Sequence, residues 1–475
     1  MRVSKLLKRK VNNNHPINDL KNDSRKVNSN DVFYAIKGSL SNGNEYILMA
    51  INNGAKTIVS EENCDLSNQY PNINFILVED VRKTLALHAK IFYQNISSSM
   101  ILIGITGTNG KTTVSTLIYK YFQYLNKKAT LIGTNGIYIM NRFFSTNNTT
   151  PDILEIYQIL LESKKNGVNH VIMEVSSHAI KMLRIFGIDF KIALITNLTQ
   201  DHLDFHKTME DYRYTKGIFL SRIAEENTVI INKDMEDYQL FNHLTKANVL
   251  TYGQSNSNFQ FINPIFSIEE TKFDLKIANK IYPIKTSLLG LFNVYNLTSF
   301  IAIIYQLRLF NNQTIEFINS KINILGRMEV LKISNRYCVI DFAHTPDGVL
   351  NVLNFLNYVK INKLILVIGC GGERDPGKRK IIGDIAVRLA NYVIFTNDNP
   401  RGEEPDMIIK DILEGVKTNN YQVILDRKMA IEEAFKLSLN NDIIAILGKG
   451  NEQYQIFKDE KIPFNDKIIV QGIKL

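Results

Sequence analysis

The chain has 475 residues with an ordinary globular composition, 45% hydrophobic and 22% charged, and a formal net charge of +9. A soft prior of about 150 residues per domain predicts three domains. No stretch approaches the roughly 18 consecutive apolar residues of a membrane-spanning helix, and the basic start lacks the apolar core of a secretory signal. Three scattered cysteines form neither a disulfide framework nor a metal pair, which indicates a reducing cytoplasm. The excess charge is compatible with nucleic acid, an anionic membrane surface, an acidic small molecule or a merely basic surface.

Short apolar runs alternate with helical-looking segments, which predicts an α/β protein with parallel strands. We interpret the polar segment 95–100 as a linker. Ligands of open parallel sheets bind beyond the carboxyl ends of the strands, so we expect the chemistry at the ends of the later runs. In chain order the runs fall at 31–38, 55–60, 74–80, 101–113, 170–177, 191–199, 337–344, 363–372, 391–400 and 442–450.

The run at 101 continues into a glycine-rich loop and a helix. Glycines let backbone N–H groups wrap a phosphate chain, Lys111 supplies a positive charge, and Thr112 can offer a hydroxyl to Mg²⁺. The loop departs from the strict phosphate-loop pattern because Ile105 occupies the first glycine position. A glycine-rich turn without a nucleotide is the alternative, but strand, loop, lysine and threonine together favour phosphate binding. The loop is Gly107-Thr108-Asn109-Gly110-Lys111-Thr112-Thr113.

Acidic and imidazole side chains follow the next runs. Glu174 ends an apolar run, where a carboxylate either holds the metal of a nucleotide or serves as a structural partner. The segment 201–206 holds two carboxylates and two imidazoles, a density that fits a metal site, a phosphate site or a surface cluster. Lys216, taken alone, is typical of a solvated helix lysine.

These segments, in this order, resemble the Mur ligases, the ATP-dependent amide-forming enzymes of peptidoglycan synthesis. The resemblance covers nearly the whole chain. It implies a UDP-substrate-binding α/β domain at 1–97, a central P-loop parallel-sheet ATP-binding domain at 98–325, and a Rossmann-like amino-acid-binding domain at 326–475. The motifs are TGTNGKTT, NTTPD (148–152), EVSSHA (174–179), TNLTQDHLDFH (196–206), GLFNVYN (290–296), GRMEV (326–330), DFAHTPDG (341–348), GCGGERDPGKR (369–379), DNPR (398–401) and GKGNE (448–452).

The resemblance also implies roles for individual residues, including a Lys216 that is carbamylated by CO₂. The expected catalytic residues are Lys111, Glu174, His202, Lys216 and Arg327. The expected Mg²⁺ ligands are Thr112, Glu174, His202 and the carbamate of Lys216. ATP is expected to contact Gly107, Thr108, Asn109, Gly110, Lys111, Thr112, Thr113, Asn293, Asn296 and Asp341. Substrates are expected to contact Ser24, Thr149, Thr150, Ser176, Arg184, Arg374, Asp398, Asn399, Pro400, Arg401, Gly448 and Glu452. Three positions depart from the family pattern, namely Gln200 for Arg, Met182 for Gln and Asn451 for His.

The implied reaction activates a carboxylate as an acyl phosphate at the expense of ATP, and an amine then attacks the carbonyl. The DNPR motif bears on the choice of amine. Arg401 can pair bidentately with the second carboxylate of diaminopimelate, and it repels the bare ammonium of lysine. Relatives that take lysine lack this arginine. The sequence therefore favours addition of meso-2,6-diaminopimelate to UDP-N-acetylmuramoyl-L-alanyl-D-glutamate.

Four other functions compete with this interpretation. A sister ligase that adds lysine and a folylpolyglutamate-type ligase are disfavoured by DNPR and by the lack of an identifiable folate-type loop. A non-catalytic nucleotide-binding regulator would not need Lys111, Glu174, His202 and Lys216 together. A nucleic-acid-binding protein is disfavoured because the basic residues are dispersed and no helix-turn-helix, RNP or zinc-finger pattern is found. We expect a cytoplasmic monomer with no nucleic-acid partner and no membrane span.

Overall fold

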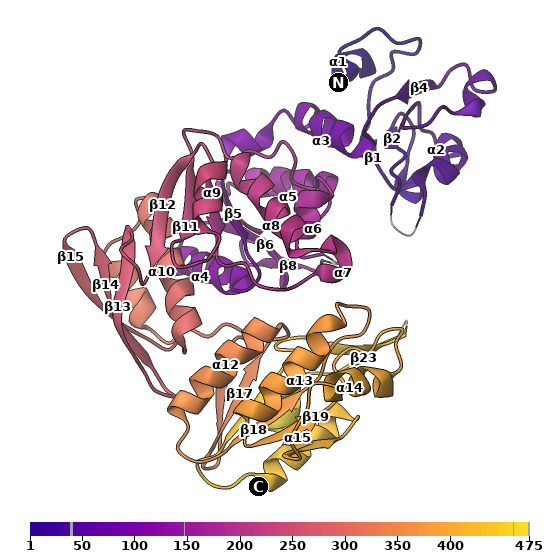
Figure 1. Ribbon diagram of the computed structural model, residues 1–475. Coiled ribbons are helices and arrows are strands. Elements are labelled where there is room, and N and C mark those ends of the chain that lie inside the picture. The colour runs from indigo at the N-terminus through magenta and orange to yellow at the C-terminus, as the bar shows by residue number, and fades with distance from the viewer. Residues whose placement is uncertain (39–40, 147, 459, 474–475) are drawn as a thin grey trace. The chain divides into compact units, whose positions relative to one another are not determined.

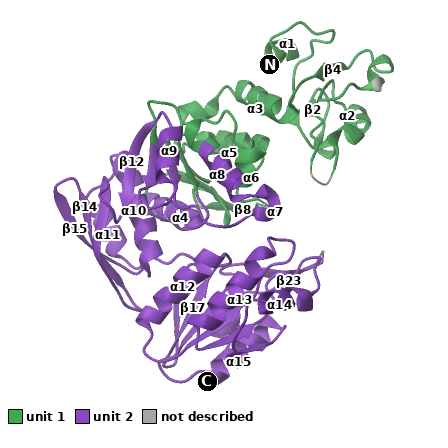
Figure 2. Ribbon diagram, viewed as in Figure 1, with its two compact units in different colours: residues 1–106, 125–193, 218–228 green, residues 107–124, 194–217, 229–475 purple. Residues whose placement is uncertain are grey.

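The computed structural model describes residues 1–38, 41–146, 148–458 and 460–473, and it divides into two compact units (Figure 2). The chain enters each unit more than once. Unit 1 comprises Met1–Thr106, Leu125–Ala193 and Ile218–Thr228, and unit 2 comprises Gly107–Tyr124, Leu194–Gly217 and Val229–Leu475.

Unit 1 begins with a small parallel sheet in the order β1-β2-β3-β4 (Figure 1). Phe33 of β2 and Ile58 of β3 share a buried apolar cluster with Ile47 and Ala50 of α2. This burial fixes which face of each strand points inward. The elements are α1 (Val3–Leu7), β1 (Leu20–Lys21), β2 (Val32–Tyr34), α2 (Ile47–Asn52), β3 (Thr57–Ser60), β4 (Asn74–Leu77) and α3 (Val81–Phe92).

The second part of unit 1 has β9 between β5 and β6, all parallel, with β7 and β8 continuing antiparallel beyond β6. The segment before it differs from the expected polar linker. Residues Ile96–Ser99 form a 3-10 turn, and Ser97 is fully buried with its hydroxyl 3.4 Å from Asp189 Oδ2. The elements are β5 (Ile101–Thr106), β6 (Ala129–Gly133), β7 (Gly136–Ile139), β8 (Arg142–Phe144), α5 (Ile153–Lys165), β9 (His170–Glu174) and α6 (Ser177–Lys181).

In unit 2 the helix α10 is buried along most of its length and packs against α4. Strands β13, β14 and β15 form an antiparallel meander in which β14 alternates between buried and more exposed residues. That alternation is the period-two pattern of a half-buried strand. Three elements near this stretch, β10, α8 and β11, contain residues of both units. The elements are α4 (Lys111–Tyr124), β10 (Ile192–Ile195), α7 (Leu203–His206), α8 (Met209–Ser221), β11 (Thr228–Asn232), α9 (Tyr238–Leu244), β12 (Asn248–Gly253), β13 (Phe259–Phe266), β14 (Thr271–Ile277), β15 (Lys280–Thr286), α10 (Leu291–Gln306) and α11 (Asn312–Asn319).

The rest of unit 2 is built on a sheet in the order β16-β17-β21-β18-β19-β20, parallel except for β16 at one edge. One face packs against α12, α13 and α14, and the other against α15 and α16. The strands β17, β21, β18 and β19 are neighbours, so their carboxyl ends lie along one edge. The elements are β16 (Glu329–Ile333), β17 (Arg336–Asp341), α12 (Pro346–Val359), β18 (Leu364–Ile368), α13 (Gly377–Leu389), β19 (Tyr392–Phe395), α14 (Pro405–Leu413), β20 (Tyr421–Val423), α15 (Arg427–Leu437), β21 (Ile443–Leu447), β22 (Tyr454–Phe457), β23 (Glu460–Pro463) and α16 (Asp466–Gln471).

The predicted α/β class with parallel sheets is confirmed, and each predicted apolar run contains a strand. The β13–β15 meander and the β22–β23 hairpin were not predicted. In the part of the chain that the structure describes, no helix is long and apolar enough to cross a membrane.

Candidate functional site

The glycine-rich loop follows β5 and leads into α4, and two of its glycines cannot be replaced without a clash. Gly107 has φ +140°, and a Cβ there would lie 1.8 Å from Thr196 Oγ1. Gly110 has φ +87°, and a Cβ there would lie 2.4 Å from Asn296 Oδ1. Both positions need the left-handed backbone that glycine adopts at no steric cost. The loop is therefore shaped by its neighbours as well as by its own sequence.

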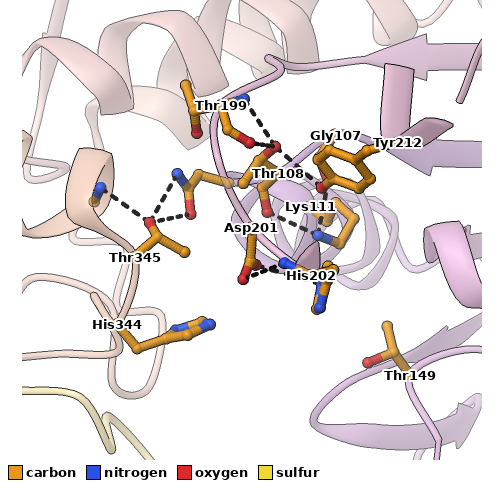
Figure 3. A network of polar contacts seen from close by, with 12 residues as sticks. Gly107, Thr108, Lys111, Thr149, Thr199, Asp201, His202, Tyr212, His344 and Thr345 are labelled. Carbon is orange, nitrogen blue, oxygen red and sulfur yellow. Dashed lines mark hydrogen bonds and ion pairs between the residues drawn. The ribbon is translucent and has the colours of Figure 1, made fainter. Parts of the chain in front are cut away.

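Hydrogen bonds from the segment after β10 hold this loop in place. The Thr196 hydroxyl donates to Asn109 O at 2.6 Å, and Asn109 N donates to Asn197 Oδ1 at 2.8 Å. The Thr108 hydroxyl donates to Thr199 O at 3.1 Å (Figure 3). These bonds stabilise the loop without a bound phosphate, which is the preorganisation that an anion site needs.

Two lysine amines converge on the same stretch of loop backbone. Lys111 Nζ donates to Gly107 O and to Thr108 O, both at 2.9 Å (Figure 3). Lys216 Nζ donates to Gly107 O at 3.0 Å. The second lysine comes from α8 and is distant in sequence, so the fold brings together two cations that neither motif predicts as neighbours.

Lys216 is not a solvated helix lysine, because its side chain is among the largest that are fully buried. Its Nζ lies 4.6 Å from the centre of the Tyr212 ring. Burial, together with the charge of Lys111, holds the pKa of Lys216 well below its ordinary value. A lowered pKa increases the share of the neutral, nucleophilic amine at any given pH.

Asp201 and His202 form a compact charged group at the end of the same segment. Asp201 is buried, its Oδ1 accepts from His202 N at 2.9 Å, and its Oδ2 lies 3.3 Å from His202 Nε2 (Figure 3). Burial opposes ionisation, but His202, His344 and Lys378 hold the pKa of Asp201 below its ordinary value. Burial and the nearby Lys378 lower the pKa of His344 to about 4. Asp201 is therefore an anion that faces a neutral His344 at neutral pH.

Residues of the C-terminal part of unit 2 contact the loop directly. Asn109 Nδ2 donates to Asp347 Oδ2 at 3.0 Å and lies 3.4 Å from Thr345 Oγ1. Gln200 Nε2 donates to Asp375 Oδ2 at 3.4 Å. The ends of β17 and β18 thus supply groups that reach the glycine-rich loop and the segment after β10.

Arg327 and Asp341 lie together at the end of β17. The Arg327 guanidinium lies 4.5 Å from the centre of the Phe342 ring, a cation–π contact. Asp341 Oδ2 accepts from Met328 N and its Oδ1 from Ala343 N, both at 2.7 Å. Burial raises the pKa of Asp341, although Arg327 and both backbone bonds oppose the rise. Asp341 therefore positions the turn that carries Arg327.

The asparagines of α10 are buried beside the loop rather than on the surface. Asn296 Nδ2 donates to Asn293 Oδ1 at 3.1 Å, and Asn293 Nδ2 donates to Leu289 O at 2.8 Å. Thr112 and Thr113 are also buried, in the first turn of α4. Asn296 thus lies against Gly110 of the loop, and Asn293 accepts a hydrogen bond from Asn296 within α10.

In unit 1, the NTTPD and EVSSHA motifs meet at the end of β9. The Thr150 hydroxyl donates to Glu174 O at 2.8 Å and accepts from Ser176 N at 3.0 Å. Arg184 donates to Thr150 O at 3.1 Å and pairs with Asp152 at 3.0 Å. The structure therefore brings together residues that the sequence assigned to one substrate.

Thr134 links Glu174 to Thr149. Its hydroxyl donates to Glu174 Oε2 at 2.9 Å and lies 3.1 Å from Thr149 Oγ1, and its backbone N–H donates to Glu174 Oε1 at 3.3 Å. Sequence analysis did not identify Thr134, which lies at the end of β6 outside every quoted motif. The Glu174 carboxylate is thus fixed in orientation as well as buried.

The DSRK segment near the start of unit 1 lies within electrostatic range of the same region. Burial and Asp152 raise the pKa of Glu155, while Lys26 and Arg184 oppose that rise. Ser24 is buried, and its hydroxyl donates to Met49 Sδ at 3.2 Å. The structure brings Lys26 near the Arg184 region, but no contact of Ser24 with Thr149 or Thr150 is observed among the described residues.

The DNPR loop follows β19 at the carboxyl edge of the C-terminal sheet. Arg401 has φ +53° and donates from Nη1 to Gly372 O at 2.7 Å. Burial and the positive charge of Arg374 lower the pKa of Arg401, while Asp398 and Glu452 oppose this. The two guanidinium groups repel each other, and an anion bound beside both would offset that repulsion.

Acidic and amide side chains lie beside these arginines. Asp398, Asn399 and Pro400 are buried, and burial raises the pKa of Asp398. Asn399 Nδ2 donates to Glu452 Oε2 at 2.8 Å. Gly448 has a left-handed backbone, and a Cβ there would lie 2.5 Å from Asp398 Oδ2, so both features require glycine. The DNPR and GKGNE motifs thus form one mixed-charge site.

The side chains expected to bind Mg²⁺ differ in their donor atoms. In the part of the chain that is described, no three His, Cys, Asp or Glu side chains gather into a metal site. Mg²⁺ bound with a nucleotide needs only one or two protein ligands, because phosphate oxygens and waters complete its shell. The Glu174 carboxylate and the Thr112 hydroxyl are oxygen donors of that kind, whereas the His202 imidazole is a softer ligand.

Several functional neighbours were not predicted from sequence. Tyr212 and Lys378 lie outside any role that the motifs assign. His344, Thr345 and Asp347 lie inside DFAHTPDG, a motif that was quoted while only Asp341 was given a role. The signal that could have found them is their position just after β17, where a doubly wound sheet binds ligands.

The chain is similar to known proteins over most of its length. The Mur ligase middle domain matches residues 105–304, and the Mur ligase glutamate ligase domain matches residues 326–450. Two similar relatives are both named UDP-N-acetylmuramoyl-L-alanyl-D-glutamate–2,6-diaminopimelate ligase. That of Halalkalibacterium halodurans is 38% identical, covering 96% of this chain and 94% of the relative. That of Caldanaerobacter subterraneus is 39% identical, covering 98% and 96%. A solved structure titled with the same enzyme name has a TM-score of 0.72 and 29% identity, covering 99% of this chain and 98% of that one.

Proposed function

The chain belongs to the Mur ligase family, and from that premise we propose that it adds meso-2,6-diaminopimelate to UDP-N-acetylmuramoyl-L-alanyl-D-glutamate with consumption of ATP. The product extends the stem peptide of a peptidoglycan precursor. The observation that carries the choice of amino acid is the position of Arg401, whose Nη1 lies 3.4 Å from Asn399 O, while the Asn399 amide donates to Glu452. The positive charge of Arg374 also acts on Arg401.

We assign three domains to the three substrates. Residues 1–97 bind the uridine nucleotide, residues 98–325 bind ATP, and residues 326–475 bind the incoming amino acid. Ser24 serves the nucleotide part of the UDP substrate, and Thr149, Thr150, Ser176 and Arg184 serve its muramyl-peptide part. The protein acts as a monomer in the cytoplasm, with no nucleic-acid partner.

The first chemical step activates a carboxylate of the UDP substrate. A carboxylate oxygen attacks the γ-phosphorus of ATP, the bond between the β-bridging oxygen and that phosphorus breaks, and ADP leaves with the electron pair. Both reactants are anions, so catalysis depends on positioning and on positive charge. Lys111 and the backbone N–H groups of 107–113 hold the phosphates, and Arg327 approaches the nucleotide from the C-terminal domain. Asn293, Asn296 and Asp341 complete the nucleotide site.

Mg²⁺ supplies further positive charge between the phosphates when it is bound. Glu174 and Thr112 would provide oxygen donors for it, and His202 would be a third ligand. Lys216 provides a fourth group after its neutral amine attacks CO₂, which forms a carbamate and releases one proton. This reaction converts a buried amine into an anion that suits a hard metal ion.

The second step joins the amino acid. A neutral amine of the amino acid attacks the activated carbonyl, the bond from carbon to the phosphate oxygen breaks, and inorganic phosphate leaves. The far end of diaminopimelate carries a carboxylate and an ammonium. We propose that the carboxylate pairs with Arg401 and Arg374, and that the ammonium pairs with Glu452. Asp398, Asn399, Pro400 and Gly448 shape the same site.

Phosphate release with different amino acids tests this proposal. Purified protein is incubated with ATP, Mg²⁺ and the UDP-muramyl-dipeptide, and phosphate release is compared with diaminopimelate, with lysine and without an amino acid. We expect strong stimulation by diaminopimelate and little by lysine, since lysine would set a bare ammonium against two arginines. Stimulation by lysine alone would overturn the specificity and leave the ligase chemistry in place.

A further inference from the structure

A fully buried lysine of the GKGNE motif lies against the DNPR motif. The Lys449 side chain has 0% exposure, and its Nζ donates to Asn399 Oδ1 at 3.0 Å and to Glu452 Oε2 at 2.7 Å. Burying an ammonium is costly unless it is paired and hydrogen-bonded. Its two partners are both residues of the proposed amino-acid site, so the buried lysine restricts the orientation of their side chains.

Asn399 has no freedom to reorient in this arrangement. Its Oδ1 accepts from Lys449 and also from Ile456 N at 3.0 Å, while its Nδ2 donates to Glu452 Oε2 at 2.8 Å. An amide oxygen has two acceptor positions, and both are used. A flipped amide would turn its NH₂ group toward two donors, so the network fixes the orientation shown.

Glu452 is left with one oxygen for a substrate. Lys449 and Asn399 both donate to Oε2. Among the described residues, no hydrogen bond to Oε1 is found, and the side chain is 27% exposed. The carboxylate is thus anchored through one oxygen, and its other oxygen can accept from an ammonium.

We propose that Lys449 is a positioning residue for the amino-acid substrate, which orients Glu452 through Oε2 and thereby presents Oε1 to the substrate ammonium. The inference rests on the proposed function and deepens it, since Lys449 itself touches no substrate. Its ammonium also offsets part of the negative charge of Glu452 and Asp398. The site then holds a zwitterionic group, with an ammonium near Glu452 and a carboxylate near Arg401.

A double-mutant cycle on the full-length enzyme tests this coupling. KM for diaminopimelate, KM for ATP and kcat are measured for wild type, Lys449→Met, Glu452→Gln and the double variant. We expect Lys449→Met to raise KM for diaminopimelate about tenfold with kcat and KM for ATP nearly unchanged. The double variant should be no worse than Glu452→Gln alone, because Lys449 acts only through that carboxylate.

Two control variants distinguish a positioning role of Lys449 from a general effect on folding. Arg336→Met removes bonds to Ser438 at the opposite end of β17 and should lower the melting temperature without changing any KM. Lys449→Gln removes the charge but keeps a donor, and it should reproduce the rise in KM if Lys449→Met does not fold. Multiplicative effects in the cycle, or a lower melting temperature with unchanged KM, would overturn the proposal.

Failure of the proposed function has a different signature, because it is seen in the wild type. If lysine replaces diaminopimelate as the substrate, the specificity is wrong, and the same cycle measured with lysine still tests Lys449. Phosphate release that no amino acid stimulates would overturn both proposals.

Discussion

The glycine-rich loop and the DNPR site are built by different means. The loop is shaped by backbone, with glycines at positive φ and with carbonyls and N–H groups held by Thr196 and Asn197. The DNPR site is shaped by charged side chains, with Arg401, Asn399 and Glu452 held by one another and by their neighbours. On the proposed function, the first arrangement holds a phosphate chain and the second selects the amino acid. We therefore expect catalysis and specificity to respond to different substitutions.

Removing the loop lysine should have the largest effect. Lys111→Ala is expected to lower kcat by about 10³-fold, because a charge that acts on the developing phosphate is lost. Phosphate release under saturating substrates measures this change. A variant with unchanged melting temperature but near-normal kcat would contradict the role of the loop.

Replacing Lys216, in the same region, should lower activity without lowering stability. Lys216→Met is expected to lower kcat by about 10²-fold, while the melting temperature does not fall, because the costly burial of an amine is removed. Activity and melting are measured in bicarbonate-free buffer and again after adding bicarbonate. Added bicarbonate should raise the activity of the wild type only, and an equal response of the variant would contradict the carbamate.

Replacing Arg401 should distinguish the two regions most clearly, because it should change the affinity for only one substrate. Arg401→Ala is expected to raise KM for diaminopimelate by about 30-fold or more, as expected for truncating one partner of a buried charge pair. KM for ATP should stay unchanged. The matched control is Arg388→Ala, which removes an exposed arginine paired with Asp384 and should change neither value. Equal loss of ATP and amino-acid affinity would remove the assignment of Arg401.

The smallest effect is expected where the C-terminal part of unit 2 meets the loop. Asp347→Ala removes the acceptor of Asn109 at 3.0 Å, together with a local bond from Asn351 within α12 at 3.0 Å. A net loss of about 1 kcal/mol predicts a rise of about fivefold in KM for ATP. Calorimetric titration with the nucleotide measures the change in affinity. A change in KM for diaminopimelate alone would contradict the role of this contact.

Much of the fold was predictable because buried parallel strands leave continuous apolar runs, as at 363–372 and 442–450. The β13–β15 meander was missed although Phe273, Leu275 and Ile277 alternate with more exposed residues, as expected for a strand with one buried face. The polar segment 95–100 folds into a turn because Ser97 finds a partner in Asp189, which no local pattern reveals.

The candidate site was predictable where a motif is local and not where partners come from distant segments. Lys111 follows from its loop, but the position of Lys216 against Gly107 needs the packing of α8. Burial of Lys449 depends on the loop after β21 lying against the DNPR loop, and the sequence alone does not show that this lysine is buried. Tertiary neighbours decide whether such a residue is solvated or functional.

The central claim is that this chain selects diaminopimelate through its arginine pair. The most direct measurement is a competition, in which wild type and Arg401→Ala are given equal concentrations of diaminopimelate and lysine, and the products are resolved by mass. The account predicts an almost pure diaminopimelate product for wild type and a ratio shifted toward lysine for the variant. A lysine product from wild type, or an unchanged ratio in an active variant, would contradict it.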